Sequence, residues 1–125
     1  MKCSTTVLYR PVGQQELDLI RELGWGAFPP RLPSQPIFYP VLSEDYAIRI
    51  ARDWNTKDPR SGFVGYVIRF HVRSDYLNQY EPHEVGGRDL REYWIPAERL
   101  DEFNNNMIGL LEVVHEFKGR EHHDD

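Results

Sequence analysis

The fold is inferred outward from one stretch, Arg88-Asp89-Leu90-Arg91-Glu92-Tyr93-Trp94-Ile95-Pro96. A charged loop containing two glycines ends here, and residues 92–96 have the composition of a short strand. Tyrosine, tryptophan and isoleucine suit a pleated, half-buried surface, and proline ends a strand because it has no N–H to donate. Glu92 therefore stands at the mouth of a strand beside a flexible loop, a position suited to a catalytic acid. An exposed glutamate on a strand edge is the alternative interpretation.

The clearest strand pattern covers residues 63–72. One face carries five large residues, namely Val64, Tyr66, Ile68, Phe70 and Val72. The opposite face is also partly apolar, which is typical of a central strand. Residues 7–12, 37–41 and 107–117 are further predicted strands. In the last of these we expect four residues to share one face, namely Leu111, Val113, His115 and Phe117.

Apolar residues at helical spacing predict two helices early in the chain. The first spans residues 14–23, with Gly24 as its stop. The second begins after Ser43, a good N-cap, and ends near Asn55. Shorter helices are predicted at residues 75–80 and 97–103. This periodicity predicts a core that includes Ile50, Trp54, Ile68, Phe70, Leu111 and Val113.

The order of these elements predicts an α+β fold. Helices concentrate early and strands late, and the short late loops favour antiparallel pairing. We expect two small packed antiparallel sheets, or one strongly bent sheet, with two or three short helices. A chain of 125 residues is long enough for a single domain, residues 1–125, with a frayed polar tail at residues 118–125.

Composition excludes several function classes. The net charge of −5, without a long basic block, weighs against general binding to nucleic-acid phosphates. Cys3 is the only cysteine, so neither an internal disulfide nor a cysteine zinc site is expected. No P-loop, dinucleotide glycine motif, zinc-protease helix or nucleophile elbow is present, and we predict no metal site. No apolar stretch is long enough for a signal peptide or a membrane span, so we expect a cytoplasmic protein without a membrane partner.

Three short segments together resemble the ADP-ribosyltransferase fold of bacterial toxins and eukaryotic mono-ADP-ribosyltransferases. They are Leu8-Tyr9-Arg10, then Phe38-Tyr39-Pro40-Val41 with Tyr46-Ala47 in the following helix, and Glu92-Tyr93-Trp94-Ile95-Pro96. They resemble, in this order, the family's first-strand arginine, its serine or tyrosine segment and its catalytic glutamate strand. Two departures stand out: Leu90 occupies the place of an acceptor-activating acid, and no Ser-Thr-Ser run is present.

The resemblance implies NAD as the substrate and a protein or nucleic acid as the ADP-ribose acceptor, with a cognate inhibitor protein as a possible partner. It implies Glu92, Arg10 and Tyr39 as catalytic residues. The implied NAD-binding residues are Tyr9, Arg10, Trp25, Tyr39, Tyr46 and His71. The alternative is a binding or interaction module that keeps the fold without catalysis, with or without a bound nucleotide.

The residue types suit this chemistry. Breaking the bond between ribose and nicotinamide builds positive charge on the sugar, which a nearby carboxylate stabilises. A planar guanidinium matches phosphate oxygens, and an aromatic face suits the cationic nicotinamide ring. Arg10, Tyr39 and Glu92 can supply these three functions.

Overall fold

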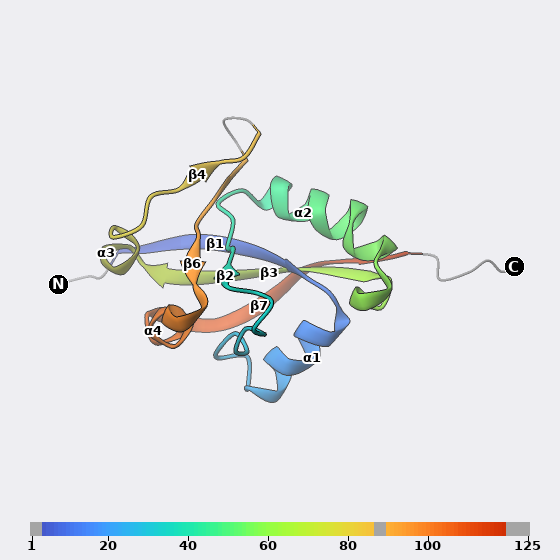
Figure 1. The fold of residues 1–125 in the computed structure, drawn as a ribbon, viewed down its shortest axis with the longest axis horizontal. Helices are drawn as coiled ribbons and strands as arrows, with labels where there is room; N and C mark the ends of the chain where they lie inside the picture. The colour runs from blue at the N-terminus through green and yellow to red at the C-terminus, as the bar shows by residue number, and fades with distance from the viewer. Residues whose placement is uncertain (1–3, 87–89, 120–125) are drawn as a thin grey trace, which may run out of the picture.

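The computed structural model describes residues 4–86 and 90–119 (Figure 1). Its strands are β1 (Thr5–Val12), β2 (Ile37–Phe38), β3 (Val64–Arg73), β4 (His83–Glu84), β5 (Arg91–Glu92), β6 (Ile95–Pro96) and β7 (Met107–Lys118). Its α-helices are α1 (Gln14–Glu22), α2 (Glu44–Asp53), α3 (Ser74–Leu77) and α4 (Leu100–Asn105). Three 3-10 turns complete the set: η1 (Asn55–Lys57), η2 (Pro59–Ser61) and η3 (Ala97–Arg99).

The described strands form small antiparallel sheets, which confirms the predicted α+β class. The largest has the order β1-β3-β7, and two further pairs are β2-β6 and β4-β5. Two isolated bridges, Tyr9 with Val41 and Val41 with Glu92, connect β1 to β5 through the segment that follows β2. The prediction was thus right in kind, but the described residues hold three small sheets and four α-helices.

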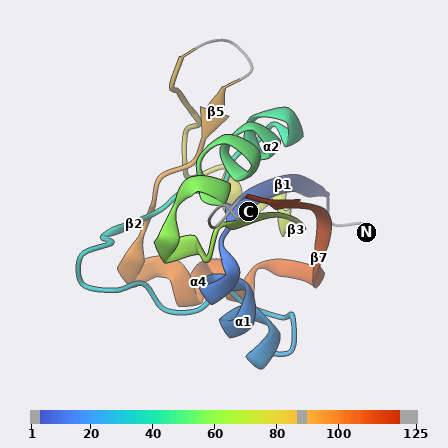
Figure 2. The same ribbon diagram turned by 90° about the vertical axis from the view of Figure 1, so that its right-hand side faces the viewer.

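Helices α1 and α2 lie on opposite sides of the three-stranded sheet (Figures 1 and 2). The larger core lies on the α1 side and includes Leu8, Ile20, Phe28, Phe38, Ile68, Phe70 and Phe103. The smaller core lies beneath α2 and is built from Val41, Ala47, Ala51 and Val67. A side chain at Gly65 would collide with the backbone of Ala51, so the glycine lets α2 approach the sheet closely.

The predicted helix ends are confirmed. The Oγ atom of Ser43 accepts a hydrogen bond from the backbone N–H of Tyr46 at 3.2 Å, which caps α2. Gly24 follows α1 with a φ of 70°, the left-handed conformation that favours glycine at a helix end.

Three of the six predicted core residues are buried, and two are exposed. Ile68, Phe70 and Leu111 are buried as predicted. Trp54 is 73% exposed, because α2 turns its two small alanines toward the sheet. Val113 is 40% exposed, and Ile50 is half-buried. The helical pattern predicted that α2 was amphipathic but gave the wrong register for its buried face.

The prediction that β7 keeps one apolar face is wrong. Val113 pairs with Ile68 and His115 pairs with Val67, so two residues that are adjacent in β3 face residues two apart in β7. Adjacent strand residues point to opposite faces, and this bulge therefore moves the pattern of β7 to the other face. Leu111 consequently packs in the larger core, whereas Phe117 packs against the smaller one.

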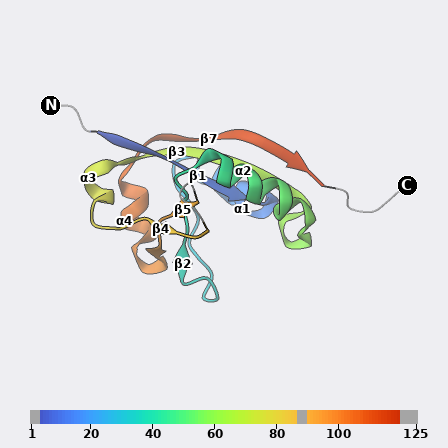
Figure 3. The ribbon, with the colours of Figure 1, turned by 90° about the horizontal axis from the view of Figure 1, so that it is seen from above.

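The predicted strand at residues 92–96 is split into two parts. Arg91 and Glu92 of β5 pair with β4, which lies beside β5 in Figure 3. Ile95 and Pro96 pair with β2 instead. The chain thus changes partner at Tyr93 and Trp94. In the predicted loop at residues 85–91, positions 87–89 lie outside the described residues, as do positions 120–125 of the predicted tail. None of the described helices has the length and apolar character needed to cross a bilayer.

Candidate functional site

A cavity of about 480 Å³ lies where β1, the segment after β2, α2 and β5 meet. It is lined by Arg10, Pro11, Tyr39, Val41, Ile50, Asn55, Glu92 and Trp94. We call it the Glu92 cavity. The two backbone bridges at Val41 explain why it forms, since they hold β1 and β5 on either side of one short segment. Arg10, Tyr39 and Glu92, which lie far apart in the sequence, therefore share one cavity.

Two side chains donate hydrogen bonds to the carboxylate of Glu92. The indole Nε1–H of Trp94 donates to Oε2 at 2.8 Å, and the hydroxyl of Tyr46 donates to Oε1 at 3.3 Å. Burial, followed by the proximity of Glu92, raises the pKa of Tyr46 above its ordinary value of 10.0. Tyr46 therefore keeps its proton and stays a donor at neutral pH.

Arg10 is a buried cation that already has a carboxylate partner. Its Nε and Nη2 atoms donate to the two oxygens of Glu16 at 2.7 and 2.9 Å. Its Nη1 makes only a long contact, 3.4 Å, to the backbone oxygen of Tyr39. The guanidinium also lies 4.7 Å from the centroid of the Phe38 ring. Arg10 thus supports the wall of the cavity and offers one nitrogen edge for a ligand.

A second guanidinium belongs to the same neighbourhood. The Arg31 guanidinium lies 5.8 Å from the centroid of the Phe38 ring. Burial and the nearby Arg10 lower the pKa of Arg31. Its Nη2 donates to the backbone oxygen of Ile37 at 3.1 Å, and among the described residues no carboxylate forms an ion pair with it. Among the described residues, Arg31 therefore adds a positive charge beside the Arg10–Glu16 pair.

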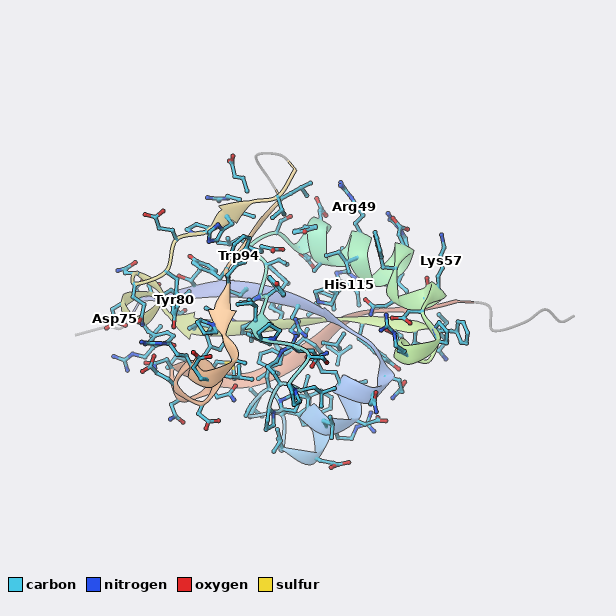
Figure 4. The ribbon with its side chains drawn as sticks, viewed as in Figure 1. Arg49, Lys57, Asp75, Tyr80, Trp94 and His115 are labelled. Atoms are coloured by element: carbon cyan, nitrogen blue, oxygen red, sulfur yellow. The ribbon has the colours of Figure 1, made fainter. Side chains whose placement is uncertain are left out.

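Two partly exposed aromatic rings face the Glu92 cavity. Tyr39 and Trp94 are 41% and 44% exposed, and their centroids are 6.5 Å apart at an interplanar angle of 84°. His83 stacks on the Trp94 ring, with a centroid distance of 3.8 Å and an interplanar angle of 7°. In Figure 4, Trp94 lies in the region between β4 and β1. An aromatic surface thus adjoins the carboxylate.

The other predicted NAD contacts lie elsewhere. Tyr46 donates to Glu92 but lines a neighbouring cavity of about 390 Å³, together with Arg49 and Arg91. Tyr9 packs against the smaller core beneath α2, where burial raises its pKa. Trp25 and His71 line a separate cavity of about 740 Å³ along β7. The structure therefore does not bring Trp25 and His71 to the Glu92 cavity.

Sequence reasoning missed four residues around the site: Glu16, Arg31, His83 and Trp94. Trp94 carried a usable signal, because residues two apart in a strand point to the same face and Glu92 was already a candidate. Glu16 stands in the first turn of α1, six residues after Arg10. Arg31 lies over the Phe38 ring from a loop, and His83 stacks on Trp94 from a two-residue ladder. Their spacing in the sequence gave no indication of either placement.

The Glu92 cavity combines one oriented carboxylate, the Arg10 guanidinium at its wall and an aromatic surface, and the Arg31 guanidinium lies over the same Phe38 ring as Arg10. Such a set suits a ligand that has a cationic or electron-poor ring beside anionic groups. In the part of the chain that the structure describes, no group of three or more His, Cys, Asp or Glu side chains gathers to hold a metal ion. The chain matches no protein-family model, no curated protein and no solved structure.

Proposed function

We propose that this protein is a NAD-dependent mono-ADP-ribosyltransferase with the ADP-ribosyltransferase fold. It would transfer ADP-ribose from NAD⁺ to a protein or nucleic-acid acceptor. The observation that carries the proposal is the convergence of Arg10, Tyr39 and Glu92 on one cavity. The resemblance in sequence named these three residues from separate segments, and the two bridges at Val41 bring their strands together.

Glu92 would act on the sugar in the bond-breaking step. The bond from the ribose C1′ to the nicotinamide nitrogen breaks, and its electron pair leaves with nicotinamide. The carboxylate of Glu92 stabilises the positive charge that develops on the sugar. An acceptor nucleophile then bonds to C1′ and loses its proton to solvent. Leu90, two residues before Glu92, supplies no second carboxylate to activate the acceptor.

The remaining groups bind the two ends of NAD⁺. The exposed faces of Tyr39 and Trp94 suit the nicotinamide ring, which is cationic before the bond breaks. The pyrophosphate requires cations, and Arg31 with the free edge of Arg10 supplies them. The cavity of about 480 Å³ is open enough for part of the dinucleotide, with the adenosine end extending outside.

A second candidate is a binding module without catalysis. The observation that favours it is the bidentate ion pair between Arg10 and Glu16, which occupies most of the guanidinium that a phosphate would need. Such a module would bind a nucleotide or a protein partner, such as a cognate inhibitor, through the same surface.

Three measurements on one preparation separate these functions. Calorimetry reports NAD⁺ binding, and chromatography reports nicotinamide release. NAD⁺ carrying a labelled adenylate then shows transfer to acceptors in a lysate. Release together with transfer supports the transferase, whereas binding without release supports the module. A folded protein that neither binds nor cleaves NAD⁺ would contradict both nucleotide-based functions and leave only the protein-binding module.

A further inference from the structure

We propose that Trp94 is a positioning residue for Glu92 and that His83 in turn fixes Trp94. This inference rests on the proposed function, in which Glu92 stabilises the developing sugar cation. A carboxylate acts in this way only if its oxygens stand at a defined distance from the reacting carbon. The structure shows which contacts can define that distance.

The indole of Trp94 makes the closer of the two hydrogen bonds to Glu92. Its Nε1–H lies 2.8 Å from Oε2, whereas the hydroxyl of Tyr46 lies 3.3 Å from Oε1. Among the described residues, each carboxylate oxygen thus has one donor. Both donors bind the same carboxylate, so the two bonds differ mainly in length, and the bond from the indole is the shorter. The indole therefore contributes more than the phenol to fixing the orientation of the carboxylate.

The indole itself contacts two aromatic neighbours. His83 is the ladder partner of Glu92 in the β4–β5 pair, and its ring stacks on Trp94 at 3.8 Å and 7°. Tyr39 meets Trp94 at 84°, with a centroid distance of 6.5 Å. An indole that is 44% exposed would otherwise sample several rotamers. The stacked imidazole thus acts through Trp94 on the carboxylate, since among the described residues no side-chain hydrogen bond joins the His83 ring to Glu92.

Trp94 also lines the cavity, so its positioning function must be separated from contact with the nicotinamide ring. Trp94→Phe keeps an aromatic face and removes the N–H donor. We expect this variant to lower kcat about tenfold to a hundredfold, the range expected when a catalytic group is misplaced. The KM for NAD⁺ should change less than about twofold, because the lost interaction matters mainly in the transition state.

His83 supplies a graded test. His83→Ala removes the stack but leaves the indole–carboxylate hydrogen bond possible, so kcat should fall less than in Trp94→Phe, by about threefold to tenfold. His83→Phe restores a ring of similar shape and should recover most of that loss. Trp54→Phe is the matched control, since Trp54 is 73% exposed and does not line the Glu92 cavity.

A second readout does not depend on activity. In the nitrogen–proton NMR spectrum of the full-length protein, the indole signal of Trp94 is assigned by its loss in Trp94→Phe. Its position should move in Glu92→Ala and its hydrogen exchange should accelerate, while the signals of Trp25 and Trp54 stay unchanged. An unmoved Trp94 signal overturns the positioning inference whether or not NAD⁺ is cleaved. Wild-type kcat in folded Trp94→Phe also overturns it, whereas absent NAD⁺ cleavage in the wild type contradicts only the proposed function.

Discussion

Predicted site residues line three cavities, and two of these, the Glu92 cavity and the one that holds Trp25 and His71, differ in their chemistry more than in their volume. The one along β7, which we call the β7 cavity, is the larger, at about 740 Å³ against about 480 Å³. It is lined by Trp25, His71 and the segment 108–113, and its only carboxylate, Glu112, accepts from Arg69 at 3.1 Å. The Glu92 cavity is smaller, but it gathers a carboxylate, a cation and aromatic rings from four parts of the chain.

This difference shows that polar residues from separate segments meeting in one cavity identify a site better than the volume of the cavity does. The β7 cavity is bounded by a single run of β7 with neighbours from Trp25 and β3, so its lining follows mostly from one local sequence. The Glu92 cavity exists only because long-range bridges bring separate segments together. Polar groups gathered in this way usually serve a ligand, because their desolvation would otherwise be unfavourable.

The sharpest test compares one carboxylate from each cavity. Glu92→Gln keeps the size of the side chain but removes the charge that stabilises the sugar cation. Turnover of NAD⁺ should fall about a hundredfold or more, with little change in NAD⁺ affinity. Glu112→Gln, in the β7 cavity, is the control and should leave turnover unchanged. Equal losses in the two variants would show that the comparison between the cavities is mistaken.

Affinity should separate the aromatic residues in the same way. Tyr39→Ala removes a ring from the Glu92 cavity and should weaken NAD⁺ binding about tenfold, a typical effect for losing a cation–π contact. Trp25→Ala removes a ring from the β7 cavity, and the NAD⁺ dissociation constant should stay the same. Calorimetry measures both constants, and circular dichroism confirms that each variant is folded. If NAD⁺ bound more weakly to Trp25→Ala and with unchanged affinity to Tyr39→Ala, the nucleotide site would have to lie in the β7 cavity.

The fold and the candidate site were predictable to different extents. The strand at residues 63–72 and both early helices followed from local periodicity, because burial on one side imposes a pattern on nearby residues. Trp54 shows the limit of this reasoning, since the alanines of α2 face the sheet and the tryptophan faces solvent. The bulge that turns the apolar residues of β7 to the other face could not be predicted either, because it depends on pairing with β3.

For the site, the sequence supplied residue types but not their neighbours. Arg10, Tyr39 and Glu92 were named from short motifs, and the structure places them in one cavity. The sequence did not indicate that Glu16 would occupy most of the Arg10 guanidinium, or that Arg31 would lie near the same Phe38 ring. These contacts arise from α1 and from the loop after it, whose placement depends on the whole core.

Arg31 permits a finer test of the charge balance. Arg31→Gln removes the guanidinium that has no carboxylate partner in the described structure, so NAD⁺ affinity should fall about threefold to tenfold. Raising the salt concentration should weaken binding to the wild type more than to the variant. Arg60→Gln, at a side chain that is 91% exposed, is the control. Identical salt dependence in wild type and Arg31→Gln would remove Arg31 from the phosphate site.

The smallest expected effect is a change in stability at alkaline pH, and it tests the hydroxyl beside Glu92. The pKa of Tyr46 is raised above 10.0 in the folded protein, mainly by burial and then by Glu92. The folded state therefore holds this proton more tightly than the unfolded state. The resulting stability is fully present below pH 10 and is lost as the pH rises through the higher folded value.

Tyr46→Phe removes this titration together with the hydrogen bond to Glu92. Urea unfolding at pH 7 should show a loss of about 0.5–1.5 kcal/mol, the net contribution of a typical hydrogen bond, because this one is long at 3.3 Å. Above pH 10 the variant should lose stability less steeply than the wild type. It would still lose some, because burial also raises the pKa of Tyr9, Tyr66, Tyr76 and Tyr93. Tyr76 lines neither cavity. Tyr76→Phe should therefore also reduce the loss of stability above pH 10, but without changing NAD⁺ turnover. If the free energy of unfolding fell equally in Tyr46→Phe and in the wild type above pH 10, Tyr46 would not be the half-buried donor to Glu92. This donor is one of the features that distinguish the Glu92 cavity from the β7 cavity.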